Sequence, residues 1–453
     1  MKFLILLLIS ISTNIFAGIE QAPPNFMVKG SKAVFIDFQT AQYNLEYDTK
    51  NQKVSVHSLI TFHQNEKGHP LFDSINKIES ISINNVESRV HQVSSPGNVT
   101  KLQMVNVELM PGTHTMELRT SMSKGVSFNT ERNRWHNVSS AFFIRDLKDR
   151  MFLEKYLPTN LEFDQYQMNM NVAVTGTNRF HSLFVNGKMT KHSENNFSVE
   201  FPNYYSSSSV FFHLVPINKF VRWYLKYPSI DGRELPVTIY SSFRFYNNFL
   251  KKKAWNVLSE LEKDYGPWPH DQLIIYGTGI KGGMEYAGAT ETSIVSLGHE
   301  LQHSYFAKGI HPANGNSGWL DEAIASWRDK GHQSHDLPFY QSANLAAHSP
   351  YTRKTDKRSY EYGRSFMAYI DYQLKNAGRL GLKDFLAKYF HKRKFTTVTT
   401  EDFRSDLEDY AQMSFSEDFR QYLYGVDSTH KDSLPAHNPH HPEISEDELN
   451  SIL

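Results

Sequence analysis

Residues 299–306 read HELQHSYF, and this stretch decides how the second half of the chain is interpreted. His299 and His303 are four positions apart, so on a helix both imidazoles project from one face, one turn from each other. Two imidazoles placed in this way can share one metal ion, and the carboxylate of Glu300 can reach a water molecule bound beside it. The stretch therefore predicts a helix with two metal ligands and a general base.

A catalytic zinc ion needs a third protein ligand and a fourth position that stays open for water. Glu322 stands 19 positions after His303, in the segment WLDEA (319–323). It follows the loop NGNSG (314–318), whose glycines can turn the chain back toward the histidines. The sequence therefore predicts that one Zn2+ ion is bound by His299, His303 and Glu322.

This spacing of zinc ligands resembles that of the gluzincin metallopeptidases of the aminopeptidase N family. A second segment, GGMEY at residues 282–286, resembles the family's GxMEN exopeptidase motif, with tyrosine in place of the asparagine. The resemblance implies that Glu285 binds the free α-amine of a peptide substrate. It also implies that the backbone of Gly283 and Met284 pairs with the peptide like an added β-strand.

The segment YEYG at residues 360–363 resembles the family's Y-x-K-G motif, whose tyrosine hydroxyl stabilises the oxyanion of the reaction. Tyr360 stands three positions before the glycine, as in the motif, and Tyr362 is the alternative because it is adjacent to the glycine. Asp329, seven positions after Glu322, stands where the family often has another acid. It is interpreted either as a hydrogen-bond partner of a zinc histidine or as a solvated helix charge.

The chain of 453 residues suits two domains. Up to about residue 235, apolar and polar residues alternate and turn residues separate the runs, which indicates an antiparallel β domain. After that point, apolar residues are spaced by three and four, which indicates helices around a small sheet. We therefore expect an α+β multidomain fold, with an N-terminal β domain at residues 18–235 and a thermolysin-like, mainly helical catalytic domain at residues 236–425.

Residues 426–453 contain several histidines and prolines, and we expect them to form a flexible tail. Many members of the family carry a long C-terminal helical domain that covers the active site. Only the tail follows residue 425 in this chain. The resemblance therefore implies a short member of the family with a more open cleft.

The first residues, MKFLILLLISISTNIFAG, contain a positive Lys2, an apolar run over residues 3–11 and a small Ala17. This pattern is typical of a signal peptide, here residues 1–17, that is cleaved after Ala17. The apolar run is too short to cross a hydrocarbon core, which needs about 20 residues. We expect export to the periplasm or the extracellular space, without stable insertion in a membrane.

The overall charge is balanced, since Lys and Arg total 48 and Asp and Glu total 48. No basic field is available to attract a phosphate backbone, so nucleic acid is not expected as a partner. The chain contains no cysteine, so any bound metal must use histidine or carboxylate ligands. Peptide substrates are the expected partners, and nothing in the sequence indicates an oligomeric state.

The sequence predicts zinc-dependent hydrolysis of peptide bonds, with Glu300 as the general base and removal of N-terminal residues as the leading activity. The second hypothesis is an endopeptidase or a peptidase of longer peptides, because the C-terminal domain is missing and the GxMEN-like segment is altered. The third is a zinc-bearing peptide-binding protein without turnover. The presence of Glu300 argues against it, because a structural zinc site has four protein ligands and needs no base.

Overall fold

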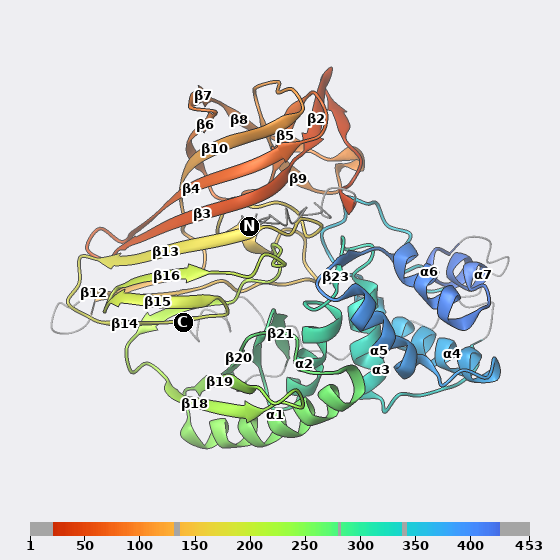
Figure 1. The fold of residues 1–453 in the computed structure, drawn as a ribbon. Coiled ribbons are helices and arrows are strands. Elements are labelled where there is room, and N and C mark those ends of the chain that lie inside the picture. Colours follow the sequence, from red (N-terminus) through yellow and green to blue (C-terminus); the bar gives the residue numbers. More distant parts are fainter. Residues whose placement is uncertain (1–20, 131–135, 280–281, 338–341, 426–453) are drawn as a thin grey trace, which may run out of the picture.

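The structure is a computed structural model, and it describes residues 21–130, 136–279, 282–337 and 342–425 (Figure 1). The expected signal peptide at residues 1–17 and the expected tail at residues 426–453 lie outside these ranges. Among the described helices, none is long and apolar enough to span a membrane.

The N-terminal region is built on an eight-stranded sheet with the strand order β15-β16-β13-β3-β4-β10-β6-β7. Strand β13 alternates as the sequence predicts, because Met168, Met170 and Val172 are buried and the residues between them are more exposed. Strand β13 pairs with β3 in parallel, which differs from the expected antiparallel domain. The two strands are far apart in the sequence, so the intervening chain has room to cross over. The strands are β3 (Asp37–Asp48), β4 (Lys53–Gln64), β6 (Ile78–Ile83), β7 (Val86–Ser88), β10 (Gly112–Ser121), β13 (Gln167–Thr175), β15 (Lys188–Ser193) and β16 (Asn196–Glu200).

Two smaller sheets complete this region. One has the order β1-β2-β5-β9-β8, with β2 and β5 parallel. The other has the order β11-β12-β17-β14, and its buried residues are continuous with the core of the eight-stranded sheet. The strands are β1 (Phe26–Val28), β2 (Ser31–Phe35), β5 (His69–Phe72), β8 (Val90–Ser94), β9 (Lys101–Val105), β11 (Val126–Thr130), β12 (His136–Ala141), β14 (His181–Val185) and β17 (Phe212–Pro216).

The C-terminal region contains a five-stranded sheet with the order β18-β19-β20-β22-β21. Its central strand is buried on both faces: Leu273 and Ile275 join the helical core, while Ile274 and Tyr276 join a cluster that includes residues of the N-terminal region. A strand buried on both faces needs a continuous apolar run, which explains the sequence LIIY. The strands are β18 (Val221–Pro228), β19 (Glu234–Ser241), β20 (Leu273–Gly277), β21 (Gly283–Tyr286) and β22 (Ala289–Thr292).

The expected domain boundary at residue 235 falls at β19, close to the turn between β18 and β19. These two strands pair with each other in the five-stranded sheet, so the change of sheet comes earlier, between β17 and β18. The predicted boundary lies later than the change of sheet because the β18–β19 hairpin is extended, like the strands before it. Apolar spacing typical of a helix follows only in the first long helix.

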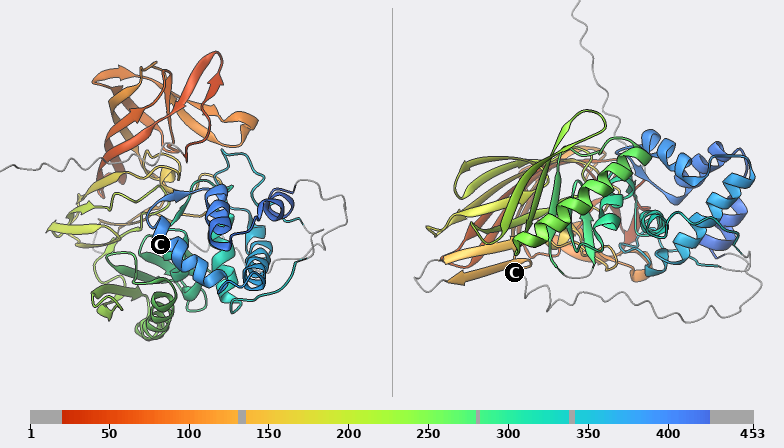
Figure 2. Two further views of the ribbon diagram at one scale, coloured as in Figure 1. Left: turned by 45° about the vertical axis from the view of Figure 1, so that its right-hand side comes forward. Right: turned by 90° about the horizontal axis from the view of Figure 1, so that it is seen from below.

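The helices lie on the side of the five-stranded sheet that is turned away from the N-terminal sheets (Figures 1 and 2). Helix α1 packs along the sheet through Leu250, Ala254, Leu258 and Leu261, which are buried at the spacing predicted from the sequence. The helices are α1 (Arg244–Tyr265), α2 (Leu297–Phe306), α3 (Trp319–Asp329), α4 (Tyr362–Asn376), α5 (Leu382–Arg393), α6 (Thr400–Ala411) and α7 (Ser416–Asp418), with short helices η2 (Pro96–Asn98), η3 (Leu153–Lys155), η4 (Lys357–Ser359) and η5 (Phe419–Leu423) and strands β23 (His311–Pro312) and β24 (Thr397–Val398).

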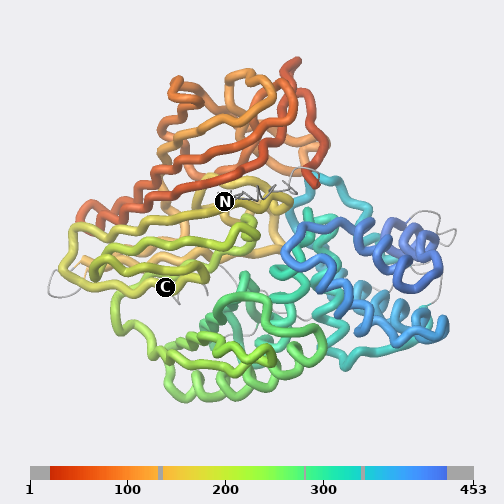
Figure 3. Tube along the Cα trace, in the orientation of Figure 1, coloured from red at the N-terminus to blue at the C-terminus, as the bar shows by residue number. Residues whose placement is uncertain are grey.

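Residues 342–361, which lead into α4, lie against the N-terminal region (Figure 3). The hydroxyl of Tyr351 donates a hydrogen bond to the carbonyl of Pro24 at 2.6 Å. The backbone N–H of Thr355 donates to the carbonyl of Asp146 at 2.9 Å. The segment that leads into α4 is therefore held by the N-terminal region.

A buried ion network strengthens this connection. The guanidinium of Arg353, in the same segment, donates to Asp73 at 2.6 Å and lies 3.2 Å from Glu154. Asp73 also accepts a hydrogen bond from Arg150 at 2.5 Å. The side chains of Arg353, Asp73 and Glu154 are at most 2% exposed. Charges buried to this degree stabilise a structure only when they are paired, so each side of the contact requires the other.

We expect the substitution Arg353→Met to lower the free energy of unfolding by about 3 kcal/mol, because it leaves Glu154 without a cation and Asp73 with one partner fewer. The measurement is the urea unfolding midpoint. The control is Arg119→Met on strand β10, where an exposed arginine lies 3.8 Å from Glu117. This control should cost less than about 1 kcal/mol. Equal effects of the two substitutions would contradict the importance of the buried network.

Candidate metal centre

Helices α2 and α3 bring the three predicted zinc ligands to one point. Nε2 of His299 lies 3.2 Å from Oε2 of Glu322, and Nε2 of His303 lies 3.7 Å from the same oxygen. One potential ligand atom of each residue lies within 4.8 Å of the others. The side chains of His303 and Glu322 are almost fully buried, and that of His299 is partly exposed. The three side chains thus come from two helices, and His299 is the most exposed of them.

The two helices meet because both bury apolar residues in one core, including Leu301 of α2 and Ala323 of α3. The loop between them must pass close to the segment that follows α3. A Cβ atom at Gly315 would lie 2.3 Å from the carbonyl oxygen of Lys354, and one at Gly318 would lie 2.3 Å from the hydroxyl of Thr355. Glycine at these positions therefore permits the close approach of the loop to this segment.

The ligand set fits a zinc ion. Two imidazoles and one carboxylate are the donors of many catalytic zinc sites, in which a fourth position stays open. Burial lowers the pKa of His303 to about 3, although Glu322 opposes the shift. The ring therefore stays neutral, as a metal ligand must be.

Asp329 at the end of α3 contacts the first histidine. Its Oδ2 atom lies 2.8 Å from Nδ1 of His299, whose Nε2 then faces Glu322. Burial opposes ionisation of Asp329, but the hydrogen bond to His299, together with the charges of His299 and Arg328, outweighs it and lowers the pKa of the carboxyl. Of the two interpretations of this residue, the geometry favours a partner that orients the histidine over a solvated charge.

Glu300 lies on α2 beside strand β21. A Cβ atom at Gly283 would lie 2.4 Å from Oε1 of Glu300, so glycine leaves the space that this carboxylate fills. Burial raises the pKa of Glu300 well above its usual value; His299 opposes the shift, and Glu285 and Glu322 add to it. A buried carboxyl with a raised pKa is suited to proton transfer near neutral pH.

Strand β21, which includes Gly283 and Met284, is the last strand of the five-stranded sheet and pairs with β22. In the described part of the chain, no strand pairs with its other edge. Unpaired backbone groups at a sheet edge are suited to an extended peptide that adds as a strand. The position next to Glu300 makes this edge suitable for a peptide substrate.

Tyr360 contacts the predicted ligands and Tyr362 does not. The hydroxyl of Tyr360 donates to Oε1 of Glu322 at 2.5 Å, and its ring is nearly parallel to that of His299 at a centroid distance of 5.9 Å. Tyr362 packs against the helical core, and its carbonyl accepts a hydrogen bond from Tyr422. Burial, followed by the charge of Glu322, raises the pKa of Tyr360 well above its usual value, so the hydroxyl keeps its proton.

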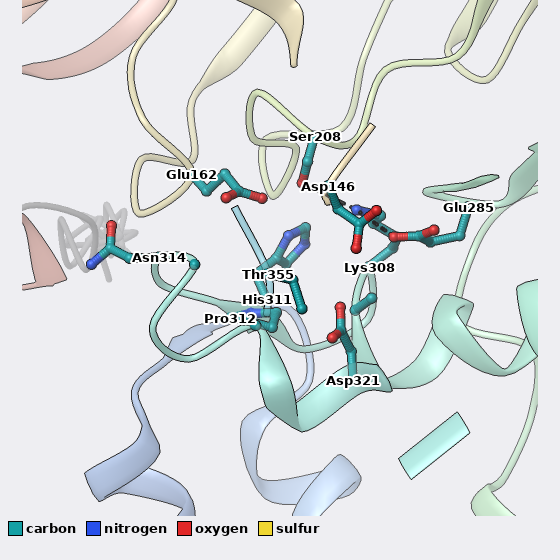
Figure 4. A pocket seen from close by; sticks show the side chains of 13 residues that line it. Asp146, Glu162, Ser208, Glu285, Lys308, His311, Pro312, Asn314, Asp321 and Thr355 are labelled. Carbon is teal, nitrogen blue, oxygen red and sulfur yellow. Dashed lines mark hydrogen bonds and ion pairs between the residues drawn. The ribbon is translucent and has the colours of Figure 1, made fainter. Parts of the chain in front are cut away.

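Glu285 has a buried partner that sequence reasoning missed. Its Oε1 atom lies 3.3 Å from Nζ of Lys308, and Lys308 also donates to the hydroxyl of Ser208 at 3.2 Å. Glu285 and Asp321 each place an oxygen within 4.8 Å of a ring nitrogen of His303. The ion pair of Glu285 with Lys308 (Figure 4) therefore lies next to the predicted metal ligands. Lys308 and Asp321 are close to the zinc motif in sequence and could have been noticed there, whereas Ser208 has no sequence signal.

We expect Asp329→Asn to weaken zinc binding about 10- to 100-fold, because His299 loses the carboxylate that orients it. Competition between the protein and a fluorescent chelator measures the dissociation constant. Asp409→Asn, at an exposed position on α6, is the matched control and should leave zinc affinity unchanged. Wild-type affinity in Asp329→Asn would show that the contact with His299 does not support the metal site.

No family model and no curated protein sequence matches this chain. Similar solved structures include yeast leukotriene A4 hydrolase in complex with bestatin, with a TM-score of 0.62, 14% identity, and 89% of this chain and 69% of that chain covered. They also include a variant of an M1 zinc metallopeptidase from Deinococcus radiodurans bound to the substrate Tyr-Ser-Ala, with a TM-score of 0.59, 15% identity, and 86% of this chain and 95% of that chain covered. Likeness at these identities concerns the fold. The expected α+β fold is confirmed, and the resemblance noted in the sequence is confirmed at the level of the fold: this chain has the fold of the M1 zinc metallopeptidases.

Proposed function

We propose that this protein is a zinc-dependent peptidase that removes residues from the N-terminus of peptides. The observation that carries the proposal is the convergence of His299, His303 and Glu322 beside the buried carboxylate of Glu300. The fold supports it, because similar structures are zinc metallopeptidases and one of them is bound to a tripeptide substrate. Export by a cleaved signal peptide stays a prediction that rests on residues 1–17 alone.

A zinc ion held by the three ligands would supply Lewis-acid activation of the attacking water and of the scissile carbonyl. The side chains around it would carry out the proton transfers. Glu300 accepts a proton from the water and delivers it to the leaving amine. Tyr360, whose hydroxyl already lies at Glu322, donates a hydrogen bond to the carbonyl oxygen as it becomes negative.

The substrate would lie along strand β21, with its backbone paired to Gly283 and Met284. Its α-ammonium would then reach the carboxylate of Glu285 and compete there with Lys308 for a charge-assisted hydrogen bond. Asp321 adds a second carboxylate close to the same point. This arrangement would place the first peptide bond, rather than a later one, beside Glu300.

We expect Glu300→Gln to bind zinc like the wild type and to lose about 10²- to 10⁴-fold in kcat on aminoacyl substrates, because the amide cannot accept the proton. Metal analysis and steady-state kinetics measure the two effects. Glu87→Gln, at an exposed position on strand β7, serves as the control and should match the wild type. Full activity of Glu300→Gln would exclude the proposed mechanism.

A second candidate function is that of an endopeptidase, and the contact between Glu285 and Lys308 favours it. The carboxylate of Glu285 already pairs with the ammonium of Lys308, so a free substrate amine is not its only possible partner.

Acetylation of the substrate distinguishes the two candidates. For an aminopeptidase, an acetylated peptide should be cleaved at least about 100-fold more slowly than the free peptide, because it has no ammonium to pair with the buried carboxylates. Mass spectrometry of the products identifies the bond that is cut. The same peptide amidated at its C-terminus is the control and should be cleaved like the free peptide. Internal cleavage of acetylated and free peptides at similar rates would establish the endopeptidase instead.

A further inference from the structure

The N-terminal end of helix α1 exposes a cluster of large apolar side chains. Phe243, Phe245 and Phe249 are between 58% and 84% exposed, and Val295, which precedes α2, is 78% exposed. Three of the four exposed phenylalanines among the described residues thus lie at this one helix end. Single exposed apolar side chains are ordinary on a protein surface, whereas a cluster of them marks a surface that binds a partner.

These four side chains form one continuous surface, which we call the α1 patch. Phe243 directly precedes the helix, and Phe245 and Phe249 project from the same helix face because they are four positions apart. Lys253 continues this face one turn later. Its ammonium donates a hydrogen bond to the carbonyl of Val295 at 3.1 Å, which places Val295 beside the phenylalanines.

The α1 patch lies on the outside of the molecule. Helix α1 forms the lower edge of the structure in Figure 1 and lies in front when the structure is seen from below (Figure 2). The opposite face of the helix packs against the core of the five-stranded sheet through Leu250, Ala254 and Leu258. The phenyl rings therefore project from a helix surface that carries no other element of the described fold.

Positive charge surrounds the patch. Residues 235–259 contain four basic residues and no acidic one, although the whole chain has equal numbers of the two. The four are Arg244, Lys251, Lys252 and Lys253. Lys251 and Lys253 contact a tryptophan ring and a backbone carbonyl, and none of the four forms an ion pair within the described ranges. Basic side chains beside exposed aromatic rings are typical of helices that lie on an anionic membrane surface.

We propose that the α1 patch binds the surface of a bilayer that contains anionic phospholipids. The phenyl rings would enter the boundary between headgroups and acyl chains, and the basic side chains would contact the phosphates. A bilayer is fluid and needs no shape that matches the projecting rings. A second copy of the chain fits less well, because a two-fold interface sets the same patch against itself and the basic residues of the two copies would repel each other. The proposal involves no membrane-spanning segment and does not depend on the proposed function.

The test measures binding to vesicles by sedimentation. It uses residues 18–453, the form expected after cleavage of the signal peptide, because the apolar run at residues 3–11 would itself bind lipid. This form retains every residue that the structure describes. We expect vesicles of phosphatidylcholine and phosphatidylglycerol to bind at least about 10-fold more tightly than vesicles of phosphatidylcholine alone, and the difference to shrink as salt is added.

Substitutions in the patch should weaken this binding without unfolding the protein, since the side chains are exposed. The double substitution Phe245→Ala/Phe249→Ala should bind anionic vesicles at least about 10-fold more weakly, because two phenyl rings no longer leave water. Lys252→Gln should bind about 5-fold more weakly, as expected for one basic residue at an anionic surface. The control Val86→Ala removes an exposed apolar side chain of strand β7, which lies at the opposite end of the molecule in Figure 1, and should bind like the wild type.

A second measurement reports the position of the patch directly. Because the chain contains no cysteine, Phe245→Cys can carry a single environment-sensitive fluorophore. Its emission should shift to shorter wavelength when anionic vesicles are added, whereas the same label in Val86→Cys should not respond. An absence of wild-type binding to vesicles, or equal binding of the wild type and Phe245→Ala/Phe249→Ala, overturns the proposal. Emission at residue 245 that is already shifted before lipid is added also overturns it, because the chain itself or a second copy then covers the patch.

Discussion

The close packing of α2 against α3 is the constraint on which the rest of the site depends. One carboxylate, that of Glu322, can meet two imidazoles only if these helices approach closely and the loop between them turns sharply. Apolar residues such as Leu301 and Ala323 bring the helices together in one core. The loop passes so close to the following segment that a Cβ atom at Gly315 would lie 2.3 Å from a carbonyl oxygen. Core packing and the loop glycine thus determine the geometry of the metal ligands.

The N-terminal region contributes contacts and side chains to the site. Through Arg353 and Thr355 it holds the segment that ends at Tyr360, so its buried charges help to place a hydroxyl at Glu322. It also contributes Glu162 to a pocket beside the candidate metal ligands (Figure 4). A change in how the two regions pack would therefore alter this pocket without touching a candidate metal ligand.

A cluster of buried carboxyl groups is the second feature that shapes the site. Carboxyl groups on α2, α3, β21 and the N-terminal region meet in a buried volume, and burial raises the pKa of several of them, including Glu300 and Asp146. Lys308 compensates part of this charge through Glu285. A divalent ion at the histidines would compensate a further part. The same charge excess therefore favours the binding of a metal ion at the histidines.

The sequence by itself indicated the change from a β region to a helical region and pointed to His299, His303 and Glu322 as candidate zinc ligands, because these follow from local periodicity and from short spacing. The tertiary structure decided the rest. It placed the hydroxyl of Tyr360 at Glu322, placed Lys308 at Glu285, paired β3 with β13 in parallel and brought acids of the N-terminal region to the pocket. Each of these features depends on contacts between segments that are distant in sequence or on the direction in which a side chain packs. A local pattern does not specify such contacts, because they are set by how complete layers of the protein fit together.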